Sequence, residues 1–189
     1  SGGQNMGKLD NAKTGKQNTE TLVDDYSFSG DSLAKAENSN HRLLYLTPEL
    51  STNIHISGTS KVSIRLSSSK PAANLSVWLV SLPWNKESNA KITDNIITRG
   101  WADPQNHSSL TKGELLIPGE FYEVSFNLMP DDQIIPKGQQ IGLMIFSSDK
   151  EFTLWPNPGT ELTVDLDATT LTIPIVGGME AYVNAVKKD

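Results

Sequence analysis

Residues 136–176 read PKGQQIGLMIFSSDKEFTLWPNPGTELTVDLDATTLTIPIV, and this stretch decides the fold of the chain. Residues 141–146 are apolar on both sides of an extended chain, which is typical of a central strand buried on each face. Residues 162–166 and 171–175 alternate apolar and polar side chains around a connection at 167–170, and this predicts a hairpin with one face in water. The stretch contains no evident catalytic constellation.

Short strands with similar patterns lie before this stretch. Residues 74–82 are again apolar on both faces, so we place them centrally, beside residues 141–146. Residues 121–128 alternate cleanly and present one apolar face. Further strands are predicted at residues 42–46, 53–57 and 61–67. Many short strands, few helices and no β-α-β alternation predict an all-β fold, an antiparallel β-sandwich of the jelly-roll, galactose-binding-like type.

One sandwich domain is predicted at residues 23–177, with a segment on either side of it. Residues 1–22 are polar and lack periodicity, so we expect a linker or a wrapped tail. Residues 178–189 have apolar positions at helical spacing and predict a short amphipathic helix packed on the sandwich, with Lys187 and Lys188 where the helix dipole favours cations.

Composition and charge argue against several functional classes. The 189 residues are enough for one domain with a substantial core. The formal net charge of −6 argues against a nucleic-acid partner, which needs a basic face for phosphates. No apolar window is long enough to span a membrane, and the absence of cysteine excludes disulfides and thiolate chemistry. No signal peptide is visible, but a start at Ser1 suggests a fragment, so a cytoplasmic and an exported location both remain open.

The motif Gly30-Asp31-Ser32-Leu33 matches the signature of a class of lipases and esterases. An autonomous esterase would need a base within hydrogen-bond reach of the Ser32 hydroxyl, yet Asp103–His107 has one residue too many for the expected partner motif. We therefore interpret the motif as a loop followed by a short helix at residues 31–37, capped by Asp31 or Ser32. No Gly-x-Ser-x-Gly nucleophile elbow occurs in the chain.

No metal site and no cofactor are predicted. The three histidines, His41, His55 and His107, are scattered, and none has a second histidine at ligand spacing. The pairs Asp131-Asp132 and Asp165/Asp167 have the oxygen donors that calcium prefers, but a solvated turn is the favoured interpretation because no further donor motif surrounds them.

A long, mostly irregular connection is predicted at residues 83–118, and loops of this length are usually functional or packed against something. Trp84 and Trp101 lie in it, and Trp155 lies near another loop. Loop tryptophans can stack on sugar rings, so a carbohydrate-binding module that binds a glycan is the alternative function. Burial against the core or against a neighbouring domain is favoured, because tryptophan is usually largely buried.

Several ordered blocks between about residue 75 and residue 178 resemble a known family. These blocks are Arg99–Pro104 (RGWADP), Leu116–Gly119 (LIPG), Gly138–Gly142 (GQQIG), Ser147–Asp149 (SSD), Phe152–Leu154 (FTL), Pro158–Glu161 (PGTE) and Pro174–Gly178 (PIVGG). The chain resembles the C-terminal domain of bacterial X-prolyl dipeptidyl aminopeptidases, relatives of cocaine esterase and of α-amino-acid ester hydrolases. Residues 1–40 match this family poorly.

The resemblance implies a jelly-roll domain packed against an α/β-hydrolase catalytic domain of the same polypeptide, where a Ser-Asp-His triad releases Xaa-Pro dipeptides from peptide N-termini. No catalytic residue of the family maps onto this chain, which alone is expected to be inactive and to act structurally. Candidates for the domain contact are Arg99, Trp101, Asp103, Trp84 and Trp155. Arg99 would reach a carboxylate while Trp101 fills a pocket. An internal ion pair and an internal core residue are the alternative for these two.

Overall fold

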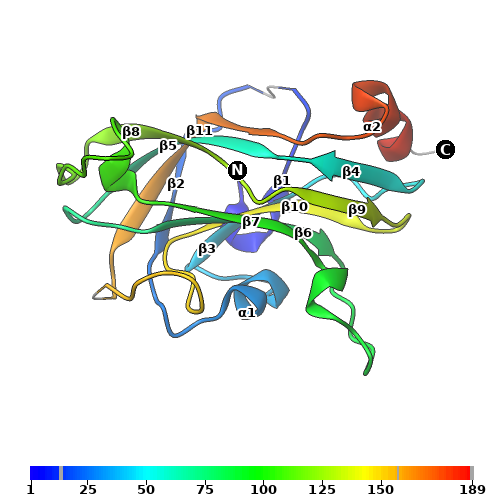
Figure 1. The fold of residues 1–189 in the computed structure, drawn as a ribbon, viewed down its shortest axis with the longest axis horizontal. Coiled ribbons are helices and arrows are strands. Elements are labelled where there is room, and N and C mark those ends of the chain that lie inside the picture. The colour runs from blue at the N-terminus through cyan, green and yellow to red at the C-terminus, as the bar shows by residue number, and fades with distance from the viewer. Residues whose placement is uncertain (13–14, 157, 188–189) are drawn as a thin grey trace.

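A computed structural model describes residues 1–12, 15–156 and 158–187 of the chain. Two β-sheets lie face to face, and a short two-stranded sheet extends from one end (Figure 1). The five-stranded sheet has the order β1 (Gly7–Lys8), β3 (Arg42–Leu46), β10 (Gln140–Phe146), β6 (Leu75–Leu82) and β7 (Ile96–Ala102). The four-stranded sheet has the order β2 (Thr19–Val23), β11 (Glu161–Thr172), β5 (Lys61–Ser68) and β8 (Phe121–Asn127). The predicted all-β sandwich is confirmed.

The remaining elements are short. Strands β4 (Ile54–Gly58) and β9 (Asp131–Ile135) form the two-stranded sheet. The helices are α1 (Gly30–Lys35) and α2 (Gly178–Val186), and single 3-10 turns lie at η1 (Gly3–Asn5), η2 (Ile92–Asp94) and η3 (Pro104–Asn106). Within the described residues, no helix is long and apolar enough to cross a membrane.

The core lies between the two larger sheets, and the predicted central strands are at its middle. Strand β10 pairs with β3 on one side and with β6 on the other, all antiparallel. Every residue of β6 is buried, because its inner face packs against the four-stranded sheet and its outer face forms part of a second apolar cluster that includes residues of α1. This double burial explains why residues 74–82 and 141–146 show no polar face.

The hairpin predicted within residues 162–175 is wrong. Residues 161–172 form one long strand, β11, and both halves pair with β5. The register shifts between Asp165 and Thr170, so the residues that we took for a turn form a bulge within a continuous strand. The Thr169 hydroxyl donates to the Asp165 carbonyl across this bulge, at 2.8 Å.

The irregular connection predicted at residues 83–118 also contains a strand that the sequence pattern did not indicate. Strand β7 pairs with β6 and forms an edge of the five-stranded sheet, with a register shift between Leu79 and Val80. Its sequence, IITRGWA, mixes a charge and a glycine with apolar residues, so local alternation is weak. Pairing with the buried strand β6 decides its conformation.

Residues 1–22, expected as a linker or wrapped tail, contribute to both large sheets. Strand β1 pairs parallel with β3, and β2 pairs antiparallel with β11. The Glu20 carboxylate accepts from the backbone N–H groups of Gly2 and Gly3 and from the Tyr45 hydroxyl, the last at 2.7 Å. These contacts hold the first residues of the chain against β3.

The closing helix α2 begins at Gly178 and ends at Val186, before the predicted end of the helix at residue 189. Tyr182 and Ala185 are buried, whereas Met179 is 61% exposed, so the apolar face is narrower than its spacing indicated. Lys187 follows the helix as its C-cap, and Lys188 lies outside the described residues.

Helix α1 packs on the outer face of the five-stranded sheet, and its first residue must be small. The cap predicted at Asp31 or Ser32 is wrong, because the N-cap is Ser29, whose backbone is extended. A Cβ atom on Gly30 would overlap the ring of Trp78. The glycine of the esterase-like motif therefore has a packing role.

Replacing Gly30 by alanine is expected to lower the free energy of unfolding by about 1 to 3 kcal/mol, because the added methyl group forces α1 away from the Trp78 ring. Urea denaturation of the two chains measures the difference. Gly113 to alanine is a useful control, because its backbone is not left-handed and the nearest atom to its added Cβ, Nδ2 of Asn106, lies 3.9 Å away. An unchanged midpoint for the Gly30 variant would contradict the packing.

Candidate docking site

The outer face of the five-stranded sheet carries a row of large side chains. Leu44, Met144, Trp78 and Arg99 occupy matching positions on β3, β10, β6 and β7. The first three are buried and share an apolar cluster with residues of α1. Arg99, on the edge strand, is only partly buried. The row therefore runs from buried side chains beneath α1 to a partly exposed arginine on the edge strand β7.

Asp149 lies just beyond the end of β10 and holds this edge together. It is fully buried, and its Oδ2 accepts from the indole nitrogens of Trp78, at 2.8 Å, and Trp101, at 2.9 Å. Its Oδ1 is buried without a hydrogen-bond partner among the described residues. Burial raises the pKa of the Asp149 carboxyl, and the two indole donors and the charge of Arg99 partly offset this effect.

The segment around Asp149 is fixed by further buried polar contacts. The Asp24 carboxylate accepts from the backbone N–H of Ser148, at 2.8 Å, and from its hydroxyl, at 3.0 Å. The Asn74 amide donates to the Ser148 hydroxyl and to the Leu154 carbonyl, at 3.0 and 2.8 Å. Because these groups come from three distant parts of the chain, the loop at residues 147–156 has a defined position.

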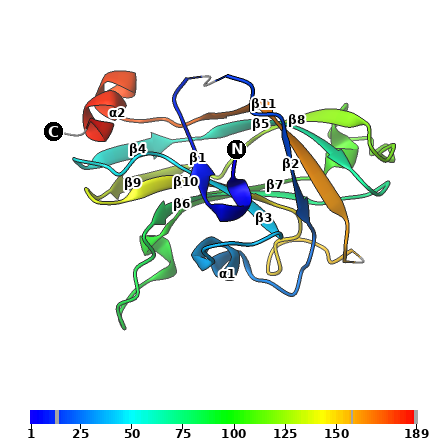
Figure 2. The same cartoon turned by 180° about the vertical axis from the view of Figure 1, so that it is seen from behind.

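An apolar patch covers the outside of this loop. It consists of Tyr26, Phe152, Leu154 and Trp155. Leu154 is 87% exposed, and Phe152 and Trp155 are at least half exposed. The rings of Tyr26 and Trp155 are parallel with centroids 5.3 Å apart, so the two loops that form the patch are in contact. In both Figure 1 and Figure 2 the loop after β10, drawn in yellow to orange, lies on the same side of the molecule as α1.

Arg99 and Trp101, two of the predicted contact residues, both lie against the Phe152 ring. The guanidinium carbon of Arg99 lies 4.6 Å from the Phe152 ring centroid and 5.3 Å from that of Trp78. The Trp101 ring stacks on Phe152 at 4.9 Å. Asp103 is exposed and instead caps η3, where it accepts from the backbone N–H of Gln105.

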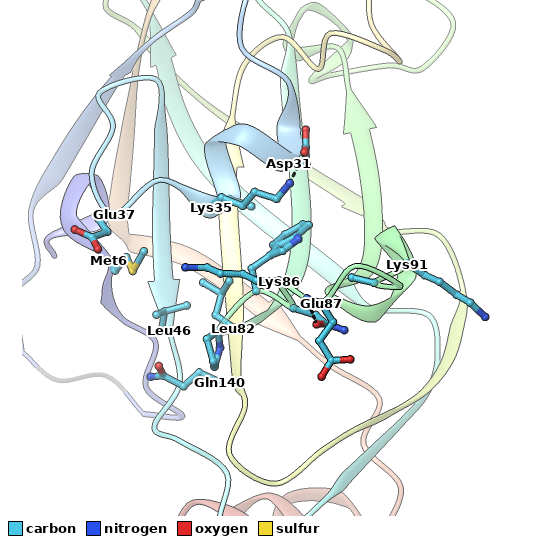
Figure 3. A pocket seen from close by; sticks show the side chains of 15 residues that line it. Met6, Asp31, Lys35, Glu37, Leu46, Leu82, Lys86, Glu87, Lys91 and Gln140 are labelled. Atoms are coloured by element: carbon cyan, nitrogen blue, oxygen red, sulfur yellow. Dashed lines mark hydrogen bonds and ion pairs between the residues drawn. The ribbon is translucent and has the colours of Figure 1, made fainter.

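Trp84 lies apart from this cluster, in a pocket of about 900 Å³ beside α1 (Figure 3). The Lys35 ammonium lies 4.9 Å from the Trp84 ring centroid and is paired with Asp31 at 2.7 Å. Acidic and basic side chains line this pocket in equal number, namely Asp31, Glu37, Glu87, Lys35, Lys86 and Lys91. Figure 3 shows that the Lys91 side chain points away from the pocket.

The serine and two of the histidines considered for catalysis or for metal binding are occupied by structural contacts. The Ser32 hydroxyl donates to the Ser29 carbonyl at 2.7 Å. His41 bonds the Val23 carbonyl, and His107 packs on the Tyr122 ring. None of these contacts supplies a base to Ser32, so an autonomous esterase has no support here.

At least one member of each acidic pair considered for calcium has a partner within the chain, whereas Asp131 Oδ2 is buried without a hydrogen-bond partner among the described residues. Asp132 pairs with His55 at 2.6 Å, and Asp165 pairs with Arg65 at 2.5 Å. Among the described residues, no group of three or more acidic, histidine or cysteine side chains is arranged to hold a metal ion. The pair Asp131-Asp132 begins strand β9, so the turn expected at that pair is wrong.

The sequence pattern did not indicate the role of Asp149 or of its partner Trp78. One signal was present, because Asp149 lies three residues after a strand that is apolar on both faces. A carboxylate that is buried needs hydrogen-bond donors around it. Which donors these are depends on strands β6 and β7, which are distant in sequence.

Comparison with known proteins identifies the family. Residues 3–184 match the family described as the X-Pro dipeptidyl-peptidase C-terminal non-catalytic domain. The chain belongs to this family. A Rhodopirellula baltica protein, provisionally assigned as an Xaa-Pro dipeptidyl-peptidase, is 59% identical over 177 residues, which cover 94% of this chain and 28% of that protein. A Lacticaseibacillus rhamnosus Xaa-Pro dipeptidyl-peptidase is 35% identical over 92 residues, or 49% of this chain and 11% of that protein.

Solved structures with the same fold are likewise much longer than this chain. An α-amino acid ester hydrolase superposes with a TM-score of 0.65 at 14% identity, over 87% of this chain and 33% of that one. An aminopeptidase from a Thaumarchaeota archaeon gives a TM-score of 0.64 at 13% identity, over 90% of this chain and 34% of that one. At these identities the likeness concerns the fold alone. The chain therefore spans about a third or less of the proteins that it resembles.

Proposed function

We propose that this domain docks on the α/β-hydrolase catalytic domain of the same polypeptide, and that the whole polypeptide is a serine peptidase that releases Xaa-Pro dipeptides from peptide N-termini. The observation that carries this proposal is the apolar patch, which is exposed although the loop beneath it is tightly held. The family description and the greater length of the relatives support a partner within the same polypeptide.

The patch has the composition of an interface core. Aromatic side chains are enriched in such cores, and they lose little conformational entropy when they are covered. The loop that carries Phe152, Leu154 and Trp155 is already ordered by Asp24, Asn74 and Asp149. Docking would therefore bury apolar surface at a small ordering cost, which is the condition for a stable interface.

The predicted contact residues take different parts in this proposal. Trp155 belongs to the patch itself, and Arg99 and Trp101 support it through Phe152. Asp103 and Trp84 lie outside the patch, and Trp84 would be reached only by a partner that also covers α1. The mechanism proposed for this domain is structural, and the catalytic triad belongs to the other domain.

Replacing Leu154 by serine is expected to weaken docking without unfolding this domain, because the side chain is almost fully exposed. Hydrogen exchange at residues 150–155 should be slower in the full-length polypeptide than in this chain alone, and the substitution should remove most of that difference. Met179 to serine is the matched control, since Met179 is also exposed but lies on α2 at the other end of the sandwich (Figure 1). Equal exchange in both contexts for the unmodified protein would refute the docking.

A further inference from the structure

We propose that Arg99 binds a carboxylate side chain of the docked catalytic domain, an inference that rests on the proposed function and specifies the chemistry of its interface. Arg99 lies at the border of the apolar patch and is half-buried. Within the described residues its guanidinium makes no hydrogen bond and no ion pair. It lies against the rings of Trp78 and Phe152 and interacts electrostatically with the Asp149 carboxylate.

The obvious internal partner is already engaged. The Oδ2 of Asp149 accepts from the indole nitrogens of Trp78 and Trp101, and the Oδ1 of Asp149 is buried without a bond to Arg99. Asp149 therefore attracts the guanidinium electrostatically, but its N–H donors have no acceptor among the described residues. A half-buried arginine without an acceptor is costly to keep, unless water or a partner supplies one.

The guanidinium is also held in place before any partner arrives. The Phe152 ring lies 4.6 Å from it and is itself stacked on Trp101, whose indole is bonded to Asp149. Contacts between a guanidinium and aromatic rings use the π faces and leave the N–H edges open. The side chain has therefore lost much of its conformational freedom already, which lowers the entropic cost of binding.

A carboxylate is the group that fits these donors. The planar fork of arginine matches a carboxylate through two parallel hydrogen bonds, which are stronger than bonds between neutral groups. Lys150, a cation in the same loop, instead donates to the Ser27 carbonyl. Since the chain carries a net charge of −6, a polyanion such as a nucleic acid is disfavoured, whereas a single aspartate or glutamate within an apolar interface is not.

Two substitutions in the full-length polypeptide test the proposal. Arg99 to lysine keeps the charge and loses the fork, and Arg99 to glutamine loses both. Hydrogen exchange at residues 150–155 is expected to speed up about tenfold or more in the glutamine variant, and by less in the lysine variant, relative to the unmodified polypeptide. In this chain alone, both variants should change exchange at these residues much less than in the full-length polypeptide, because only the contact of Arg99 with the Phe152 ring is lost there.

A charge-reversal experiment identifies the partner group. In an Arg99 to glutamate background, each exposed aspartate and glutamate of the catalytic domain is changed to arginine in turn. One of these changes is expected to restore slow exchange at residues 150–155. The proposal would be overturned if none of these changes restored slow exchange and if the single lysine and glutamine variants exchanged like the unmodified polypeptide.

The possible results distinguish the docking of the domain from the role of Arg99 in that docking. Loss of protection in Leu154 to serine together with full protection in Arg99 to glutamine would leave the docking in place and refute the role of Arg99. Absence of protection in the unmodified full-length polypeptide would refute the docking itself, and with it the role of Arg99. An increase in exchange for the glutamine variant that is as large in this chain alone as in the full-length polypeptide would assign Arg99 a purely internal role.

Discussion

Replacing Asp149 by alanine is expected to lower the free energy of unfolding of this chain by about 2 to 5 kcal/mol. The indole nitrogens of Trp78 and Trp101 share this carboxylate, and its loss leaves two donors without an acceptor, one fully and one partly buried. Each orphaned donor costs about 1 to 3 kcal/mol. Urea denaturation followed by tryptophan fluorescence measures the change, and a loss below about 1 kcal/mol would contradict this role for Asp149.

Asp149 to asparagine is the matched control, because the amide oxygen can still accept from both indoles. We expect a smaller loss of stability than in the alanine variant. The loop at residues 147–156 should keep its position, since its contacts to Asp24 and Asn74 remain. An asparagine variant as unstable as the alanine variant would show that charge, and not the shared acceptor, holds the two tryptophans.

The same pair of chains should differ in their dependence on pH. Burial raises the pKa of the Asp149 carboxyl above its ordinary value of 3.8, so the folded chain holds this proton more tightly than the unfolded chain. The contribution to stability is fully present below the unfolded pKa and is lost as pH rises through the folded pKa. The asparagine variant should lack this part of the decline in stability with rising pH. Identical dependence of stability on pH in the two chains would contradict the role of the Asp149 carboxyl.

Arg42 to alanine is expected to cost about 3 to 5 kcal/mol, because its side chain is fully buried and joins three separate segments. Its guanidinium donates to the backbone carbonyls of Leu33, Gly3 and Ala36, at 3.3, 2.5 and 2.7 Å. Burial lowers the pKa of Arg42 to about 10, so it remains charged at neutral pH. Its loss should release both η1 and α1 from the outer face of the sheet.

Arg65 provides the matched control for this prediction. It pairs with Asp165 at 2.5 Å, but its side chain is 42% exposed. The Asp165 side chain is 19% exposed and the Arg65 guanidinium also lies 4.6 Å from the Phe121 ring centroid, so the loss should exceed that of a fully exposed ion pair but stay clearly below that of Arg42 to alanine. Thermal unfolding of the two variants compares them directly. Equal losses would mean that the buried contacts of Arg42 to carbonyl groups are not the source of its effect.

Local patterns predicted the parts of the fold that depend on burial of a whole strand. Residues 141–146 and 74–82 are apolar on both faces, and they are the paired strands β10 and β6 in the middle of the larger sheet. The ordered blocks of the family lie largely in the loops around these strands, which is why the resemblance could be identified before the fold was known.

Long-range pairing decided the parts that were missed. Strand β7 has weak alternation and is formed by pairing with β6, and β11 continues through its bulge because both halves pair with β5. Residues 1–22 lack periodicity, yet they contribute a strand to each large sheet. In each case the hydrogen-bond partner lies far away in sequence, where a local pattern carries no information about it.

The sequence by itself determined a β-sandwich, the family to which it belongs and the absence of a nucleophile elbow, because alternation and ordered motifs are local properties. Only the tertiary structure decided where function can reside. It brings Asp24, Asn74, Asp149 and the tryptophans of two strands to one end of the sandwich. The apolar patch and the guanidinium of Arg99 lie together because separate loops and strands meet there. Their positions depend on the register in which β6 pairs with β10 and β7.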